Sequence, residues 1–131
     1  KMSENFNLEI ISPNKTLISS ETKQVIIPAF EGLMTILKDH ISLVTFLRPG
    51  IIEVEINNEI EKFFVEEGTV EFSKNNLLIL SSSVKNLKFF SNDEANTLLE
   101  KSKKEYSNNE LSDKDKYILS YKLETLKNIT Q

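Results

Sequence analysis

The distribution of glycine and proline divides this chain of 131 residues into two parts with different expected structures. All three glycines and all three prolines lie before residue 70, and residues 91–131 contain neither. Glycine and proline mark turns, whereas a long stretch without either favours helices. The sequence therefore predicts a part with many turns, ending between Asn86 and Ser91, followed by a helical part.

The first part alternates apolar and polar residues in the manner of half-buried strands. Phe6, Leu8 and Ile10 alternate with Asn7 and Glu9, so one face of this segment is expected to point into a core. Turns recur about every 8 to 12 residues, the spacing of a β-sandwich or barrel, and no segment with helical periodicity separates the strands. Further strands are predicted at residues 24–27, 41–47, 51–56, 60–65, 70–72 and 77–80, with tight turns at 57–58 and 73–75.

The second part has the pattern of two amphipathic helices joined by a short polar turn. Ser91 and Glu94 have the spacing of a capping box, and Ser112 with Asp115 resembles a second helix start. Two such helices should pack antiparallel and cover another surface. The apolar faces are expected at Ala95, Leu98, Leu99, Ser102 and Tyr106, and at Leu119, Leu123 and Leu126.

These patterns define the expected fold class. We expect a mainly β plus α protein, with an N-terminal antiparallel β-sandwich in residues 2–86. A C-terminal antiparallel two-helix hairpin is expected in residues 91–131. The absence of helical segments between the strands argues against a parallel α/β sheet.

Composition narrows the range of functions. A net charge of −4 argues against a nucleic-acid-binding protein, and one His with no Cys argues against a zinc site. The sequence contains neither a G-x-S-x-G nucleophile motif nor a phosphate-binding loop, so we expect no catalytic residue, no metal and no cofactor. No apolar run approaches the roughly 18 residues that span a bilayer. The start, KMSENFN, has no basic and apolar regions of the kind that form a signal peptide.

One segment carries a specific resemblance. Residues 28–50 have the pattern P-x-x-E-G-x-x-x-x-L-x-x-H-x-x-L-x-x-x-L-x-P-G, which resembles the loop of the epsilon subunit of F-type ATP synthase, called delta in mitochondria. Residues 8–13, 65–72 and 77–80 resemble further strands of that family, so the resemblance covers nearly the whole chain. The sequence departs from the family pattern at Thr35, at Lys38-Asp39, and at Glu67, where Gly is common.

The resemblance implies a non-catalytic rotor subunit of the central stalk. It implies contacts with the gamma subunit and the c-ring, for which Glu31, Gly32, Leu33 and His40 are candidates. It also implies contacts of the helical hairpin with the alpha and beta subunits and inhibition of ATP hydrolysis. The membrane would be reached only indirectly, on the cytoplasmic face of a bacterial inner membrane or the stromal face of a thylakoid. The candidates for contact with beta are Lys101, Lys103, Lys104, Lys114 and Lys122.

One departure concerns nucleotide binding. Some bacterial members of the family bind ATP through [IL]-D-x-x-R-A at the start of the first C-terminal helix. Here Asp93 is kept, but Asn96 stands in place of the Arg, and Arg48 is the only Arg in the chain. Asn lacks the permanent charge with which Arg binds phosphate. We therefore expect that the chain does not bind ATP in this way.

Other interpretations remain open from the sequence. A stand-alone β-sandwich adaptor with a helical interaction tail would have the same composition, and an enzyme would require carboxylates that converge on a pocket. His40 could serve packing alone, and Glu31-Gly32 could be a turn without a partner. The hairpin lysines could form a solvated face, since residues 91–131 carry seven Lys against eight acidic residues.

Overall fold

The structure is a computed structural model that describes residues 4–130. Met2 and Gln131, the outer limits of the two expected domains, lie outside the described residues. Within residues 4–130, ten strands come first and two helices follow. The strands are β1 (Phe6–Ser12), β2 (Lys15–Thr22), β3 (Gln24–Ala29), β4 (Gly32–Leu37), β5 (Leu43–Leu47), β6 (Gly50–Ile56), β7 (Glu59–Val65), β8 (Gly68–Ser73), β9 (Asn76–Leu80) and β10 (Lys85–Asn86).

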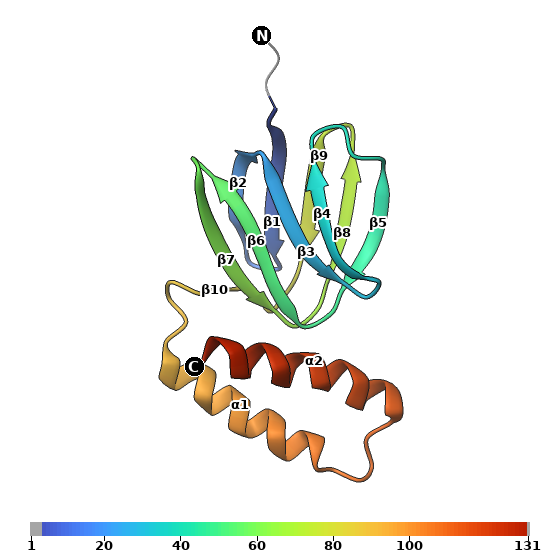
Figure 1. Ribbon diagram of the computed structural model, residues 1–131, viewed down its shortest axis with the longest axis vertical. Helices are drawn as coiled ribbons and strands as arrows, with labels where there is room; N and C mark the ends of the chain where they lie inside the picture. The colour runs from blue at the N-terminus through green and yellow to red at the C-terminus, as the bar shows by residue number, and fades with distance from the viewer. Residues whose placement is uncertain (1–3, 131) are drawn as a thin grey trace.

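The strands form two layers that face each other across one core (Figure 1). One layer has the order β10-β7-β6-β3, with β4 paired to β3, and the other has the order β5-β8-β9-β1-β2. The layers join where Ala29 pairs with Leu47. Thr22 Oγ1 donates a 2.6 Å hydrogen bond to the carbonyl of Glu55, which ties the β2–β3 corner to β6. A β-sandwich followed by two helices is the predicted fold class.

The ladders are antiparallel with one exception among the described strands. β1 and β9 run parallel, with Leu8 opposite Leu77 and Ile10 opposite Ile79. A parallel pair needs a long crossover. Here the crossover consists of β2 to β8, so local sequence patterns carry no sign of it.

Three of the described strands were not predicted from the sequence, namely β2, β4 and the two-residue β10. β2 contains Ser19 and Ser20 and pairs only with β1 at an edge of the sheet, so it lacks the apolar alternation of an inner strand. β4 has apolar residues on both faces, with Leu33 70% exposed and Ile36 fully buried. The predicted strand at 41–47 begins at Leu43 instead.

The predicted tight turns are confirmed. Asn57 and Asn58 have φ angles of 52° and 65°, and Lys74 and Asn75 have 50° and 59°. Positive φ at both central residues is the conformation that joins two antiparallel strands through a two-residue turn. Asn is among the residues that adopt this conformation most readily.

The two helices are α1 (Asn92–Tyr106) and α2 (Asp113–Ile129). The predicted capping box at Ser91 is present, since its Oγ accepts a 3.1 Å hydrogen bond from the Glu94 amide. Ser112 likewise caps α2. Tyr106 is 41% exposed, so the buried face of α1 ends one turn earlier than predicted, at Ser102. Neither helix has the length and apolar character required to cross a membrane, as judged over the described residues.

Candidate interaction surfaces

The β3–β4 turn holds three of the four residues predicted to contact gamma or the c-ring. Glu31 is exposed and accepts a 3.0 Å hydrogen bond from Thr45 Oγ1, which fixes the carboxylate against β5. Gly32 has a φ of +127°, a conformation that residues with a side chain rarely adopt. Leu33 is 70% exposed. Glu31, Gly32 and Leu33 therefore form one exposed apolar and acidic tip.

His40 lies away from this tip. Its Nδ1 is 2.8 Å from the carbonyl oxygen of Ile41, and its ring meets Phe72 edge-on at 5.9 Å. Gly32 begins β4 and His40 follows its end, and the six residues of this strand span about 20 Å when extended. Glu31, Gly32 and Leu33 therefore lie at the start of β4 and His40 lies beyond its end, and Figure 1 shows that β4 runs along the sandwich.

The candidate lysines of the hairpin fall into two groups. Lys101, Lys104 and Lys114 are exposed, as is Lys103, which pairs with Glu100 on the same helix at 3.0 Å. Lys122 differs, because its side chain is only 11% exposed and its Nζ lies 2.8 Å from Glu66 Oε1. Lys122 therefore connects α2 to the β7–β8 turn of the sandwich.

The hairpin packs on one end of the sandwich through a small second core (Figure 1). Phe64 is fully buried there with Leu99 and Leu126, separate from the main core between the layers. Phe64 stacks on Phe90 of the linker, with ring centroids 5.9 Å apart and an interplanar angle of 8°. Phe63, which is next to Phe64 on β7, points into the main core. β7 therefore contributes one face to each of the two cores.

Arg48 adds a polar contact to this second interface. Its guanidinium carbon lies 4.0 Å from the centre of the Tyr121 ring, within the range of a cation–π interaction. The Tyr121 hydroxyl is 2.8 Å from that of Tyr117, and this hydrogen bond raises the pKa of Tyr117. Sequence reasoning assigned no contact to Arg48, because its partner Tyr121 lies 73 residues further along the chain.

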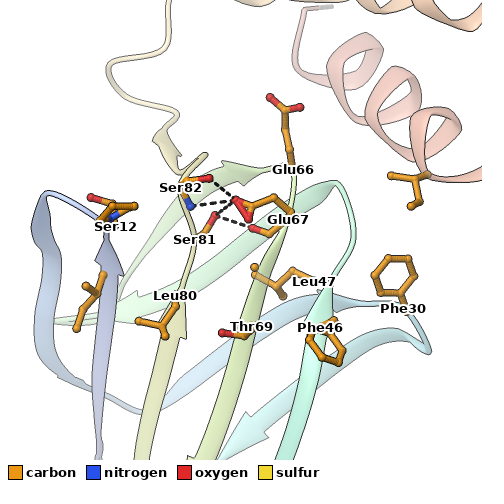
Figure 2. Close-up of a pocket in the computed structure, with 14 residues that line it drawn as sticks. Ser12, Phe30, Phe46, Leu47, Glu66, Glu67, Thr69, Leu80, Ser81 and Ser82 are labelled. Carbon is orange, nitrogen blue, oxygen red and sulfur yellow. Dashed lines mark hydrogen bonds between the residues drawn. The ribbon is translucent and has the colours of Figure 1, made fainter. Parts of the chain in front are cut away.

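An open groove of about 760 Å³ lies between α2 and the outer face of the β5-β8-β9-β1 layer (Figure 2). Sequence reasoning did not predict it, because it joins segments far apart in the chain. Glu67 stands at its rim, and its Oε1 accepts hydrogen bonds from the Ser82 amide at 3.0 Å and the Ser82 hydroxyl at 2.7 Å. The apolar lining includes Ile11, Pro13, Phe30, Phe46, Leu80 and Ile118.

The residues aligned with the nucleotide motif are solvent-exposed. Asp93 and Asn96 both lie in the first turns of α1, on its exposed side. Within residues 4–130, no group of three or more His, Asp and Glu side chains is placed to hold a metal ion.

Comparison with known proteins agrees with the loop pattern and the fold. A family model described as "ATP synthase, Delta/Epsilon chain, beta-sandwich domain" matches residues 5–86. The ATP synthase epsilon chain of Pelagibacter ubique is 42% identical over 129 residues, which is 98% of this chain and 99% of that protein. The chain belongs to the ATP synthase epsilon family. A more distant member, from Rhizobium leguminosarum, is 30% identical over 111 residues, or 84% of this chain and 82% of that protein.

Solved structures extend the similarity of fold across the whole chain. A chain from the mitochondrial ATP synthase of Euglena gracilis matches with a TM-score of 0.81 at 18% identity, covering 100% of this chain and 84% of that chain. A chain from the central stalk and c-ring structure of the Tetrahymena thermophila enzyme matches with a TM-score of 0.65 at 13% identity, covering 100% of both chains. At these identities the likeness shows a shared fold, which extends over both the sandwich and the helices.

Proposed function

We propose that this chain is a non-catalytic rotor subunit in the central stalk of an F-type ATP synthase. The observation that carries the proposal is the match to the Pelagibacter epsilon chain over 98% of this sequence, hairpin included. The sandwich would attach the subunit to gamma and to the c-ring. In this way it would help to join rotation of the ring to the catalytic head.

The exposed tip at the β3–β4 turn supports a role in binding the c-ring. Leu33 is 70% exposed and gives the tip an apolar anchor. The neighbouring Glu31 carboxylate is held by Thr45 and gives it a charge in a fixed position. His40 lies at the other end of β4 and therefore belongs to a different contact, for which gamma is the partner we propose. A glycine at positive φ keeps the turn narrow.

The hairpin would be the regulatory part. Its attachment to the sandwich rests on the small core around Phe64 and on the contacts of Arg48 and Lys122. Elements held by few apolar contacts open at lower free energy than the main core. Undocking would free Lys122 from Glu66, so that it could join the already exposed hairpin lysines in meeting acidic surfaces of the alpha and beta subunits. Those lysines are Lys101, Lys103, Lys104 and Lys114.

We further propose that the subunit lies on the cytoplasmic face of a bacterial inner membrane and contacts the membrane only through the c-ring. The P. ubique and R. leguminosarum proteins that it resembles are bacterial ATP synthase epsilon chains. The net charge of −4 gives the chain as a whole no electrostatic attraction to anionic lipid.

Truncation tests the division of labour between sandwich and hairpin. A chain ending at Asn86 would uncover Phe64, whereas a chain ending at Phe90 keeps the stacked ring that covers it. We expect the enzyme carrying the chain that ends at Phe90 to assemble and to couple proton flow to ATP synthesis, with a higher rate of ATP hydrolysis. A truncated chain that fails to bind gamma contradicts the proposed role of the sandwich, and unchanged hydrolysis contradicts the role of the hairpin.

A further inference from the structure

Strand β4 lies at an open edge of the sandwich. It pairs with β3 along its whole length, and no other strand within residues 4–130 pairs with its second side. In Figure 1, β4 lies beside β3 on the side away from β6. The unpaired N–H and C=O groups of an edge strand form a template on which a further strand can pair.

Pro28 of β3 determines which backbone groups of β4 face the open side. Pro28 has no N–H, and its carbonyl accepts a 2.9 Å hydrogen bond from the Arg48 amide on the side of β3 away from β4. Its partner on β4, Leu33, therefore belongs to a pair without hydrogen bonds between β3 and β4. Such pairs alternate with hydrogen-bonded pairs in an antiparallel ladder. Leu33, Thr35 and Leu37 thus direct their N–H and C=O groups to the open side.

β4 lacks the features that usually protect an edge strand from pairing. Its sequence, GLMTIL, contains no charged residue and no proline, and these are two of the common protections. The edge strand β2 differs, because it carries exposed Lys15 and Glu21 and pairs with β1 across a register shift. The edge strand β10 has only two residues. On β4, by contrast, Leu33 is 70% exposed and Leu37 is 50% exposed. Of these three edges, β4 is the one open to a further strand.

The side chains of β4 are complementary to those of a second β4. Two such strands that run antiparallel about a two-fold axis at Thr35 place Leu33 of each copy opposite Leu37 of the other, and the two Thr35 side by side. On the inner face, the same register places Met34 opposite Ile36. Every cross-strand pair is then apolar or Thr–Thr, and no like charges are opposed within the strand. A second copy of this chain is therefore a partner that fits the edge.

The same register satisfies the outward backbone groups. Thr35 meets the second Thr35 in a hydrogen-bonded pair, and Leu33 meets Leu37 in another on each side of it. The Leu37 carbonyl already accepts a 3.1 Å hydrogen bond from the His40 amide, but a carbonyl oxygen has two lone pairs. Thr35, at the centre, is also a position where the chain departs from the family pattern, and β-branched residues such as Thr favour strands.

We propose that two copies of this chain pair edge to edge through β4, with the two-fold axis at Thr35. The β10-β7-β6-β3-β4 layers of the two copies then form one continuous sheet. A two-fold interface of this kind uses the same surface on both copies. Its core is the six residues of β4 on each side, far fewer than the roughly 20–30 residues a side of a stable complex. The dimer is therefore weak, with an expected dissociation constant on the order of 100 µM.

The dimer has a consequence for assembly, which rests on the proposed function in one respect, namely that the β3–β4 tip binds the c-ring. Leu33 belongs both to that tip and to the paired strand, so the second copy covers it. One chain can therefore pair with a second copy or bind the ring, but not both. In the unassembled subunit, the dimer covers an apolar edge that would otherwise be open to unrelated strands.

Sedimentation velocity of the isolated full chain tests whether the dimer forms. The concentrations run from about 5 µM to about 1 mM, a range that brackets the expected dissociation constant. We expect the fraction of dimer to rise with concentration through this range. A chain that stays monomeric throughout would overturn the proposal.

Charged variants at the axis test the register. Thr35 is exposed, so Thr35→Lys and Thr35→Glu should each leave the monomer folded. Either variant alone opposes like charges across the axis and should dimerise about tenfold or more weakly, whereas an equal mixture opposes Lys to Glu and should recover the dimer. The controls, Thr16→Lys and Thr16→Glu, place the same charges at an exposed Thr of β2 and should dimerise as the parent chain does. A mixture that stays monomeric, or an equal loss in the controls, overturns the assignment to β4.

A single Cys at the axis gives an independent test, because the chain contains no Cys of its own. The Cα atoms of a hydrogen-bonded antiparallel pair lie about 5.5 Å apart, within the range that a disulfide bridges. Oxidation should therefore cross-link Thr35→Cys into a dimer and leave the control Thr16→Cys mostly monomeric. Equal cross-linking of the two variants overturns the proposed axis.

The cross-linked dimer also tests the exclusion from the ring. Added to a synthase that lacks this subunit, the reduced Thr35→Cys chain should bind and the oxidised dimer should not. Binding of both forms overturns the exclusion. Failure of both forms contradicts the proposed function alone, since the dimer itself is measured on the isolated chain.

Discussion

Replacing Phe64 with Ala should release the hairpin while leaving the sandwich folded. Phe64 is fully buried in the second core, where it packs with Leu99, Leu126 and the Phe90 ring. This cluster is separate from the strand residues that point into the main core. Full loss of a buried Phe costs about 3–5 kcal/mol. If the hairpin and linker cover roughly 100 Å² of this ring, the Ala variant loses about 2.5 kcal/mol of docking free energy at 25 cal/mol per Å² of apolar surface. The docking equilibrium should therefore fall by a factor of about 60 in Phe64→Ala.

Hydrogen exchange followed by mass spectrometry measures this change. Peptides from α1 and α2 should exchange faster in Phe64→Ala, while those from β1, β8 and β9 should keep the parent rate. The matched control is Phe72→Ala, which removes a ring that is 1% exposed and packs edge-on against Phe6 at 5.6 Å in the main core. That variant should lower the thermal midpoint of the whole sandwich. Unchanged helix exchange in Phe64→Ala, or an equal loss of sandwich stability in the two variants, would refute the separation into two cores.

Three further outcomes are expected. Gly50→Ala should lower the thermal midpoint, at a cost of about 1–3 kcal/mol, because its new Cβ would lie 2.6 Å from the Cβ of Pro28; an unchanged midpoint would mean that the backbone moves freely there. Glu66→Lys and Lys122→Glu should each speed exchange in α2, whereas the double variant should restore most of the protection by re-forming an ion pair of about 1 kcal/mol; additive losses would count against the pair. Titration calorimetry with ATP should show no micromolar binding, since Asn96 replaces the expected Arg, and a clear binding isotherm would contradict this.

Local signals in the sequence predicted the parts of the fold that local interactions determine. The capping residue Ser91, the Asn57-Asn58 turn and the alternation at Phe6 to Ile10 act within a few residues of chain, and all three are as predicted. Glycine and proline placement also located the change from strands to helices. β2 was not predicted because an edge strand needs apolar residues only on its inner face. The serines in β2 also interrupt the alternation of apolar and polar residues.

The arrangement of surfaces could not be predicted in this way, because it depends on which strands become neighbours. The parallel pairing of β1 with β9 brings Ile11 beside Leu80, and only then does the groove have a continuous floor. Likewise, the sequence does not distinguish Lys122 from the other lysines among the seven in the helical part. Only the fold shows that it pairs with Glu66. The loop pattern placed Glu31 and His40 on one segment. In the structure β4 lies between them, so the two residues are at opposite ends of this strand.

Co-purification tests the central claim most directly, namely that the sandwich attaches this chain to the stalk of an ATP synthase. The chain would be tagged in its native cell, in full length and ending at Phe90, and recovered from gently solubilised membranes. The account predicts that gamma and the c subunit accompany both forms. Recovery of either form without gamma, or with a stable set of proteins unrelated to ATP synthase, would contradict it.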